Sequence, residues 1–413
     1  MTELPIVLSL ECLSSLQANP IVIRAIPEGW IAYLDFADTF EPVAHDTESG
    51  ISRLTELLDP RTSLSFNGWV GFFGYEFLAA HFGLHLQAKR DLEIADGWFG
   101  RPSTLVHLGN TCTRVESTDP VRESEIGKIL SSAPIQSLPS FHASERTCNL
   151  DFTQYKPIFE HAREAILDGE TYQIKISQRF EAKAQIDPLL AFAKLSKTNP
   201  APEAFLLQTP RFSIISCSPE VVIDQTGDTI STRPIGGTYA RGSSSSDKSV
   251  VERFLGDSKE VSEHNMLVDL ERNDLSSLCI PGTVQLERFR EVETYAHLHH
   301  LVSTIRGTLR QGTTLSEILR GMLPGGSITG CPKARTMEWI DRLEPCFRGP
   351  YTGSFGTIED NGNLHLNLII RSMLVLGEKC FTQAGGGIVV NSTPEYEYRE
   401  NQIKAQALLD LLE

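Results

Sequence analysis

Two groups of acidic side chains are spaced so that the members of each group share one face of a helix. Glu260 and Glu263 lie three residues apart, and Glu397, Glu400 and Lys404 follow at helical spacing near the end of the chain. Carboxylate pairs from two distant segments suit Mg²⁺, which binds one or two carboxylates directly and keeps several waters. By spacing alone, two solvent-exposed helix faces explain the pattern better.

Two glycine-rich segments would let the backbone approach a ligand closely. The first, Pro324–Pro345 (PGGSITGCPKARTMEWIDRLEP), turns into a helix whose first N–H groups can hold an anion, and it lacks the G-K-[ST] ending of a Walker loop. The second, Gln383–Ser392 (QAGGGIVVNS), places three consecutive glycines in a strand-like run. A structural turn and a β-bulge remain the alternatives for the two segments.

Three further polar residues stand near apolar runs. Arg371 ends an apolar strand-like segment, where a cation needs a carboxylate partner that it can grip through two hydrogen bonds. His300 follows HLH in HLHHLVST, and Thr238 lies in RPIGGTYARG. Taken singly, each of these residues is more often structural than functional.

The elements that must position these residues are helices alternating with half-polar strands. The segment DFTQYKPIFEHAREAILDGE places Tyr155, Phe159, Ala162 and Ile166 on one helical stripe that ends at Gly169. The next segment, TYQIKISQRF, alternates as a strand, with Tyr172, Ile174 and Ile176 on one face and Gln173, Lys175 and Ser177 on the other. Turns such as IDQTGDTI and IEDNGNLH predict hairpins. The fold class is therefore α+β.

Two polar stretches interrupt this pattern. Between Ser117 and Arg146 the chain becomes rich in Ser and Pro, which predicts a linker. The run Gly242–Asp247 (GSSSSD) predicts a mobile loop.

Composition narrows the classes of function. Asp and Glu number 53 against 37 Lys and Arg, so the net charge of −16 disfavours binding to nucleic acid or to an anionic membrane. The eight cysteines form no C-x-x-C pair, which fits a reducing compartment. The first basic residue is Arg24, so no signal peptide is predicted, and no apolar run is long enough to span a bilayer. We expect a soluble, cytoplasmic protein.

The order of motifs from Phe152 onward resembles the chorismate-utilising enzymes, a family that includes anthranilate synthase component I, aminodeoxychorismate synthase component I, isochorismate synthase and salicylate synthase. The motifs that carry this resemblance are YQIKISQRF, SPE, RPIGGT, EHNMLVDLERNDL, HHLVSTIRG, PGGSITGCPKARTMEWIDRLEP, IIRS, AGGGIVV and EYRENQIKA. The first third offers one clear echo, GWVGFFGYE. The resemblance implies large antiparallel β-sheets packed with surrounding helices. It also implies a shortened, β-rich N-terminal subdomain over residues 1–145 and a chorismate-binding catalytic domain over residues 146–413.

By this resemblance, Glu263 and Glu400 bind Mg²⁺ directly and Glu260 and Glu397 reach it through water, so that the metal holds the ring carboxylate of chorismate. The remaining site residues have three implied roles. Those for substrate binding are Arg371, Gly385, Gly386, Gly387, Ser327, Lys404 and Gln173. Thr238 hydrogen-bonds the substrate, and His300 acts as the general acid for the departing hydroxyl.

The nucleophile separates the members of the family. Members that add water resemble one another in a lysine base where this chain has Gln173, and a neutral amide cannot activate water. HHLVST and PGGSITG resemble aminodeoxychorismate synthase component I. That enzyme converts chorismate and ammonia to 4-amino-4-deoxychorismate for p-aminobenzoate and folate synthesis. The ammonia would come from a separate glutamine amidotransferase subunit.

One departure concerns the lysine that aminodeoxychorismate synthases usually carry in P-I-K-G-T, which is Gly236 here. Lys175 projects from the same strand face as Gln173, and we predict that it replaces the absent lysine as the attacking amine. Pairing of Lys175 with a carboxylate is the equal alternative. Anthranilate synthase component I and aminodeoxyisochorismate synthase remain alternatives, as does a non-catalytic chorismate-binding paralogue.

Overall fold

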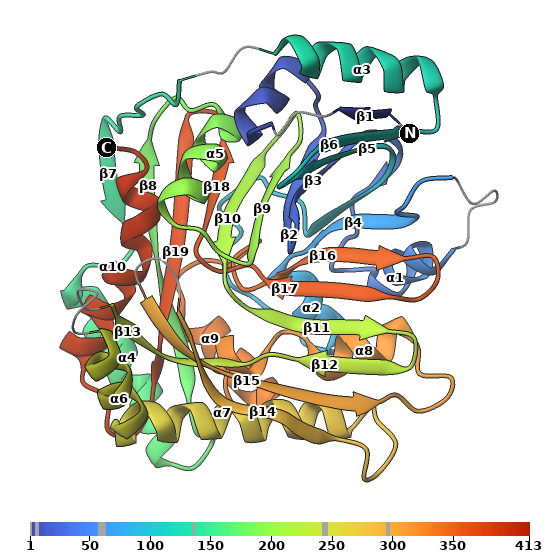
Figure 1. The fold of residues 1–413 in the computed structure, drawn as a ribbon. Helices are drawn as coiled ribbons and strands as arrows, with labels where there is room; N and C mark the ends of the chain where they lie inside the picture. Colours follow the sequence, from blue (N-terminus) through green and yellow to red (C-terminus); the bar gives the residue numbers. More distant parts are fainter. Residues whose placement is uncertain (1, 5–7, 57–62, 134–136, 242–246, 295–297) are drawn as a thin grey trace.

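The computed structural model describes residues 2–4, 8–56, 63–133, 137–241, 247–294 and 298–413. Within these ranges the strands join into one 19-stranded antiparallel sheet. The sheet branches at β5 (Gly97–Gly109), which pairs with β3 along one edge and with β4 and then β6 along the other. The two branches fold toward each other (Figure 1).

The first branch contains β5 and ten further strands, all paired with their spatial neighbours. In spatial order its strands are β1 (Thr2–Leu4), β6 (Thr113–Ser117), β5, β3 (Gly29–Phe40), β2 (Ile21–Ile26), β9 (Glu203–Gln208), β10 (Ser213–Ser218), β18 (Ser372–Leu376), β19 (Lys379–Ile388), β8 (Ile174–Lys183) and β7 (Glu145–Cys148).

The second branch leaves β5 through β4 and ends at β15, which pairs with both β13 and β14. In spatial order its strands are β4 (Gly68–Phe73), β16 (Ser354–Glu359), β17 (Leu364–Leu368), β11 (Val221–Thr226), β12 (Thr229–Thr232) and β15 (Leu298–Thr308), and β13 (Ile235–Ala240) and β14 (Gln285–Thr294) each pair with β15.

Helices cover the outer faces of the sheet: α4, α9 and α10 pack against β8 and β19, and α7 packs against β13 and β15. The α+β class with large antiparallel sheets is therefore confirmed. The helices are α1 (Thr47–Thr55), α2 (Tyr75–His81), α3 (Pro120–Ser132), α4 (Phe152–Leu167), α5 (Pro188–Thr198), α6 (Asp247–Gly256), α7 (Ser258–Ser276), α8 (Leu315–Met322), α9 (Lys333–Leu343) and α10 (Pro394–Asp410), with short 3₁₀ turns η1 (Leu10–Leu16) and η2 (Gly326–Ile328).

The helix predicted after residue 151 is α4. It begins with a reciprocal capping box between Asp151 and Gln154, which satisfies two backbone donors of the first turn. The predicted stripe of Tyr155, Phe159, Ala162 and Ile166 is buried. The two predicted hairpins are also present, because β11–β12 turns at Gly227 and β16–β17 turns at Gly362, both with positive φ.

The predicted linker between Ser117 and Arg146 is wrong over its first half, where the chain forms α3. Asp119 caps this helix and Pro120 occupies its first turn, a combination that starts helices well. Ile126 and Leu130 bury one face of α3 in the core. The loop predicted at 242–247 falls almost entirely outside the described residues.

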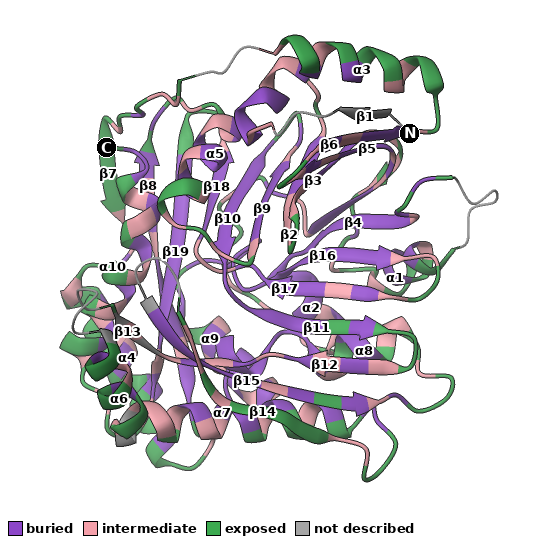
Figure 2. Cartoon of the chain, in the orientation of Figure 1, coloured by how far each residue is buried: buried purple, intermediate pink, exposed green. Residues whose placement is uncertain are grey.

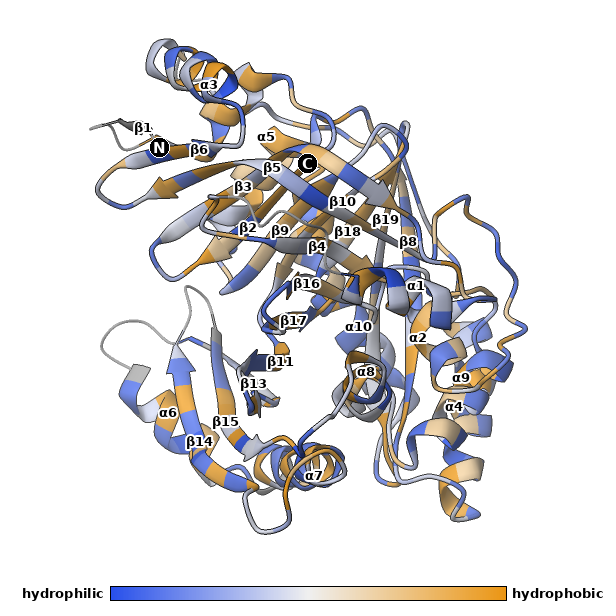
Figure 3. Cartoon of the chain, turned by 90° about the vertical axis from the view of Figure 1, so that its right-hand side faces the viewer, coloured by the Kyte–Doolittle hydropathy of each residue, from blue (hydrophilic) through white to orange (hydrophobic). Residues whose placement is uncertain are grey.

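Burial differs from strand to strand. β4 and β10 are buried along their whole length, whereas β14 is mostly exposed (Figure 2). The side view in Figure 3 shows hydrophobic colour along the central strands β9, β10 and β18. The predicted boundary at residues 145 and 146 falls inside β7, and strands from both sides of it pair, β2 with β9 and β4 with β16. Within the described ranges, every helix is too short or too polar to traverse a lipid bilayer.

Candidate active site

A cavity of ≈ 180 Å³ opens where β8 and β19 of the first branch face β13, α7 and α10. A cavity of about 150 Å³ accommodates benzene, so this one has room for a single-ring compound. Its lining is rich in charged groups: Lys175, Glu220, Glu260, Glu263, Arg371, Glu397, Glu400 and Lys404.

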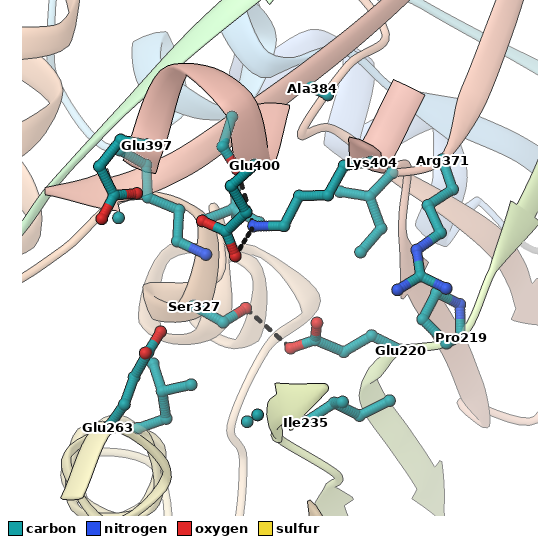
Figure 4. Close-up of a pocket in the computed structure, with 18 of the residues that line it drawn as sticks. Pro219, Glu220, Ile235, Glu263, Ser327, Arg371, Ala384, Glu397, Glu400 and Lys404 are labelled. Carbon is teal, nitrogen blue, oxygen red and sulfur yellow. Dashed lines mark hydrogen bonds and ion pairs between the residues drawn. The ribbon is translucent and has the colours of Figure 1, made fainter. Parts of the chain in front are cut away.

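The two predicted acidic groups face each other across this cavity. Glu397 and Glu400 project from α10, and Glu263 projects from α7 on the opposite side (Figure 4). Burial raises the pKa of Glu400, but the ion pair with Lys404 at 3.2 Å outweighs burial and lowers it. Burial and the neighbouring Glu400 raise the pKa of Glu397 to about 7. The Glu397 Oε1 atom accepts a hydrogen bond from Ser392 at 2.8 Å, while its buried Oε2 has no hydrogen-bond partner in the structure.

These acids are not gathered into a compact cluster. Within the described part of the chain, no three His, Cys, Asp or Glu side chains lie close enough together to hold a metal ion by themselves. Any ion shared by the two helices would need to complete its coordination shell with water or with a ligand.

The three consecutive glycines of β19, Gly385–Gly387, lie beside β8. Gly385 pairs with Ser177 and Gly387 pairs with Lys175. A side chain at Gly387 would collide with the Gln173 amide and come within 3.4 Å of the Lys175 Cε atom. The absence of a Cβ therefore lets the Gln173 side chain lie across β19, next to Lys175.

The Lys175 side chain extends from β8 into the cavity. Its amino group forms no hydrogen bond or ion pair with the residues that the structure describes. Burial and the nearby Lys404 lower its pKa, whereas Glu263, Glu220 and Glu400 oppose the change. Gln173 lies just behind the lining, with its side-chain nitrogen buried and without a hydrogen-bond partner in the structure. The face alternation predicted for this strand is thus confirmed.

Ser327 lies in η2 and donates a hydrogen bond to Glu220 Oε1 at 2.7 Å (Figure 4). Glu220 is a site residue for which the sequence suggested no role, although it ends the SPE motif. Burial raises the pKa of Glu220 to about 7, even though Ser327 and Lys175 oppose the rise. Near neutral pH this carboxyl group can therefore carry a proton inside the cavity.

Arg371 and His300 also line the cavity. Arg371 has a φ of 48°, a left-handed conformation that costs a non-glycine residue about 1–3 kcal/mol. Burial and Arg371 lower the pKa of His300 to about 4, so the imidazole is neutral. Its Nδ1 atom lies 3.3 Å from the Gly237 carbonyl oxygen. Because a carbonyl only accepts, this contact favours the tautomer that is protonated on Nδ1.

Gly236 also lines the cavity, and His264 of α7 stands directly behind it. An added Cβ at Gly236 would lie 2.6 Å from the His264 Nδ1 atom and 2.8 Å from its Cα. Even an alanine would therefore require the helix or the strand to move. The space that a side chain at position 236 would need is filled from α7.

The back wall of the cavity contains Tyr351 and Gln383, neither of which the sequence singled out as a site residue. Behind them, Arg348 is buried and forms two hydrogen bonds to Glu344, at 2.7 and 2.8 Å. Glu76 accepts from the backbone N–H groups of Arg348 and Gly349 at 2.8 and 2.9 Å. Glu76 is the last residue of the GWVGFFGYE motif, and this motif was the sequence signal that could have indicated its role.

Most of the predicted residues meet in this one cavity. The predicted residues that line it are Lys175, Glu260, Glu263, His300, Ser327, Arg371, Gly385, Gly387, Glu397, Glu400 and Lys404. Gly386 turns its open side toward Glu397, where an added Cβ would lie 2.5 Å from Oε2. Thr238 pairs with His300 in the sheet, but its side chain lies outside the described residues.

Known proteins resemble this chain in sequence. Residues 24–410 match the family model of chorismate binding enzymes. Anthranilate synthase component 1 of Haloarcula marismortui is 40% identical over 278 residues, covering 67% of this chain and 57% of that longer protein. Aminodeoxychorismate synthase component 1 of Bacillus subtilis is 33% identical over 365 residues, covering 84% of this chain and 77% of that protein.

Solved structures share the fold. Anthranilate synthase component I from Streptococcus pneumoniae superimposes with a TM-score of 0.80 at 25% identity, covering 94% of this chain and 91% of the other. MenF, the menaquinone-specific isochorismate synthase of Escherichia coli, superimposes with a TM-score of 0.77 at 19% identity, covering 100% and 94%.

Proposed function

Because the chain belongs to the family of chorismate-binding enzymes, we propose that it aminates chorismate at the carbon that bears the hydroxyl. The products are 4-amino-4-deoxychorismate and water, as for aminodeoxychorismate synthase component I, in the route to p-aminobenzoate and folate. The observation that carries this proposal is the β8 wall. Directly before this strand, just behind the cavity lining, stands the neutral amide of Gln173, which cannot deprotonate water, and the strand itself presents the amine of Lys175, which has no described partner.

In the proposed reaction, the neutral Lys175 amine forms a bond to a ring carbon conjugated with the carbon bearing the hydroxyl. The ring double bonds shift, and the hydroxyl leaves as water after taking a proton from an acid in the cavity. Ammonia then bonds to the vacated carbon, the double bonds shift back, and Lys175 leaves as a neutral amine. The proton of the new ammonium group returns to the acid.

Two groups could serve as this acid. His300 was predicted from the resemblance, but burial and Arg371 lower its pKa to about 4, so at neutral pH it has no imidazolium proton to give. Glu220, with a pKa raised by burial to about 7, holds a proton in part of the molecules at neutral pH. We therefore place Glu220 as the proton donor and His300 as a hydrogen-bond acceptor for the substrate, with Thr238 as a further substrate contact.

The donor set fits Mg²⁺. Glu260, Glu263, Glu397 and Glu400 offer hard oxygen ligands from two facing helices, and Glu397 Oε2 has no hydrogen-bond partner in the structure. The cations that line the cavity, Lys175, Arg371 and Lys404, are too few to balance these acids and a dianionic substrate together. Glu263 and Glu400 would hold the ion directly, and Glu260 and Glu397 through water. The ion would neutralise the ring carboxylate.

The other carboxylate of the substrate would meet Arg371 and the backbone of Gly385–Gly387, with Ser327 and Lys404 nearby. Ammonia would come from a separate glutamine amidotransferase subunit. None of the eight cysteines lies in the G-x-C-x-G context of an amidotransferase nucleophile, which supports a separate source.

Anthranilate synthase component I activity is the second candidate. It is favoured by Gly236, because His264 excludes the lysine that aminodeoxychorismate synthases usually carry there.

Product analysis separates these functions. The purified chain is incubated with chorismate, Mg²⁺ and ammonium, and the products are resolved by chromatography and mass spectrometry. We expect 4-amino-4-deoxychorismate, and no product when glutamine replaces ammonium. Anthranilate as the sole product would establish the second candidate, isochorismate would exclude amination, and unchanged chorismate would indicate a non-catalytic binder.

A further inference from the structure

A group of buried polar atoms lies behind the active-site cavity, where α4 and α10 pack against β19. The group contains the Tyr155 hydroxyl of α4 and two oxygens of α10, Asn401 Oδ1 and Glu397 Oε2. All three side chains are almost fully buried, and none of these atoms has a hydrogen-bond partner in the structure. Of the three residues, only Glu397 lines the cavity. Tyr155 and Asn401 therefore stand behind it.

The hydrogen bonds of Gln178 determine which way the Asn401 amide points. Gln178 donates through Nε2 to the Leu150 carbonyl oxygen at 2.9 Å, which leaves its Oε1 as an acceptor. Asn401 Nδ2 donates to this Oε1 at 3.3 Å and to the Ile176 carbonyl oxygen at 3.4 Å. The other end of the Asn401 amide is therefore its oxygen, which can only accept a hydrogen bond.

Gly386 of β19 opens the space in which these oxygens meet. A Cβ at this glycine would lie 2.5 Å from Glu397 Oε2, 3.2 Å from Asn401 Oδ1 and 3.3 Å from Glu400 Oε2. Two carboxylate oxygens and one amide oxygen thus gather over one glycine, and all of them are acceptors when the acids are ionised. Such a group repels itself unless a donor or a cation stands among the oxygens.

The Tyr155 hydroxyl is placed to be that donor. Burial and the charges of Glu397 and Glu400 raise the pKa of this hydroxyl, and Asn401 opposes the rise, so all three groups lie close to it. A tyrosine hydroxyl keeps its proton at neutral pH and can donate one hydrogen bond. The Tyr155 ring packs against Tyr398, with 5.5 Å between the ring centroids.

Ser392 holds the other oxygen of Glu397. It donates to Glu397 Oε1 at 2.8 Å and lines the cavity, so this oxygen is fixed from the cavity side. A second donor at Oε2 would stop the carboxylate from turning. Outer hydrogen bonds of this kind commonly orient the carboxylates of metal sites.

We propose that Tyr155 is a positioning residue for Glu397, whose Oε2 accepts from the Tyr155 hydroxyl, so that the carboxylate stays where it reaches the hydration shell of Mg²⁺. The inference rests on the proposed magnesium-dependent function. The oriented oxygen of Asn401 repels Glu397 Oε2 from the space over Gly386 and so directs it toward the hydroxyl. In this arrangement Tyr155 touches neither the substrate nor the ion.

Removal of the Tyr155 hydroxyl tests the proposal. We expect Tyr155→Phe to raise the Kd for Mg²⁺ roughly 10–100-fold, as measured by titration calorimetry of the substrate-free protein with magnesium chloride. Saturating Mg²⁺ should restore kcat in this variant. An unchanged Kd in folded Tyr155→Phe would overturn the proposal.

Tyr398→Phe is the matched control, because it removes the same group from the ring that packs against Tyr155, and Tyr398 does not line the cavity. Burial and Cys148 raise the pKa of the Tyr398 hydroxyl, and Gln178 opposes the rise, so this hydroxyl faces a different set of groups. Its Kd for Mg²⁺ should equal that of wild type.

A double variant separates positioning from a general loss of stability. If Tyr155 acts through Glu397, Tyr155→Phe should weaken Mg²⁺ binding in the wild-type background but not in Glu397→Gln. Equal weakening in both backgrounds would show that Tyr155 does not act through Glu397. Failure of the wild type to bind Mg²⁺, or an unchanged Kd in Glu397→Gln alone, would instead overturn the proposed placement of the metal, on which the inference depends.

A crystal structure of the magnesium complex gives a readout that needs no turnover. We expect Tyr155 Oη at about 2.6 Å from Glu397 Oε2, the usual length of a hydroxyl–carboxylate hydrogen bond. A Tyr155 hydroxyl that bonds to Asn401 alone would refute the positioning of Glu397.

Discussion

Lys175 and Gly236 lie on opposite walls of the cavity, and their surroundings decide which of the two positions can supply an attacking amine. His264 fills the space beside Gly236, so no side chain fits there without a shift of α7 or β13. On the other wall, Gly387 leaves the space that Gln173 uses, and Lys175 extends beside it into the cavity. The proposed attacking amine therefore comes from β8, and a lysine introduced at position 236 should not substitute for it unless His264 is also displaced.

Substitution of Lys175 by arginine distinguishes an attacking amine from an ion-pairing cation. Arginine keeps the positive charge but is never deprotonated, so it cannot attack. We expect Lys175→Arg and Lys175→Met to lose 4-amino product alike, with kcat falling far more than the KM for chorismate changes. Steady-state rates of both variants provide the measurement. Near wild-type turnover by Lys175→Arg would show that the residue only pairs with a carboxylate.

Glu220 should govern the pH dependence. Burial raises its pKa to about 7, so its protonated form, the proposed acid, predominates below pH 7 and is lost as the pH rises through that value. We expect kcat/KM for chorismate to fall above pH 7. Glu220→Gln should lower activity by roughly 10²–10⁴-fold and abolish this limb of the profile. A retained limb in Glu220→Gln would assign the titration to another group.

At the scale of single elements, local patterns in the sequence predicted several helices, strands and turns correctly. The stripe of α4, the two hairpins and the alternation of β8 each follow from side-chain period and turn residues within a few positions. α3 was missed because its polar surface resembled a linker, although Asp119 and Pro120 were a readable start signal.

Most candidate site residues could be found because they belong to motifs with chemical meaning. Glu220, Tyr351 and Gln383 could not be given roles, because their environment is set by segments far apart in the chain. Glu220 meets Ser327 across 107 positions, and Gln383 meets Ser177 across 206. Spacing along one helix or strand contains no information about such contacts, which depend on how the sheet closes.

Removal of one partner of the Arg348–Glu344 ion pair should destabilise the protein more than replacement of both partners. Both side chains are buried, so Arg348→Met leaves an unpaired buried carboxylate and should reduce the free energy of unfolding by about 3–5 kcal/mol. The double variant Arg348→Met/Glu344→Leu should recover part of this loss. Urea unfolding followed by fluorescence measures both. A double variant less stable than Arg348→Met would argue against the uncompensated charge as the cause.

At the scale of the whole molecule, His365 lies at the centre of a charged contact between the two branches of the sheet. It lies on β17 and contacts Glu203 of β9 at 2.9 Å and Asp224 of β11 at 3.5 Å. β9 belongs to the first branch, whereas β11 and β17 belong to the second. The contact with Glu203 therefore joins β17 to β9, two strands that do not pair through the backbone.

This contact should make stability depend on pH. Burial lowers the pKa of His365, but Glu203 and Asp224 outweigh it and raise the pKa from 6.5 to about 9. The stabilisation is therefore complete below pH 6.5 and is lost as the pH rises through 9. We expect Tm to fall from pH 6.5 to 9 by more in wild type than in His365→Gln, as measured by calorimetry. Parallel curves would exclude His365 as the source.

The branching of the sheet at β5 has a consequence for the order in which the protein is made. As the ribosome releases the chain, β4 and β2 emerge early, but their partners β16 and β9 emerge much later. Until then each presents an open edge, the kind of surface that recruits strands from other chains. The N-terminal third should therefore bind chaperones during synthesis and aggregate if translation stops before residue 359, whereas the released full-length chain closes both edges on itself.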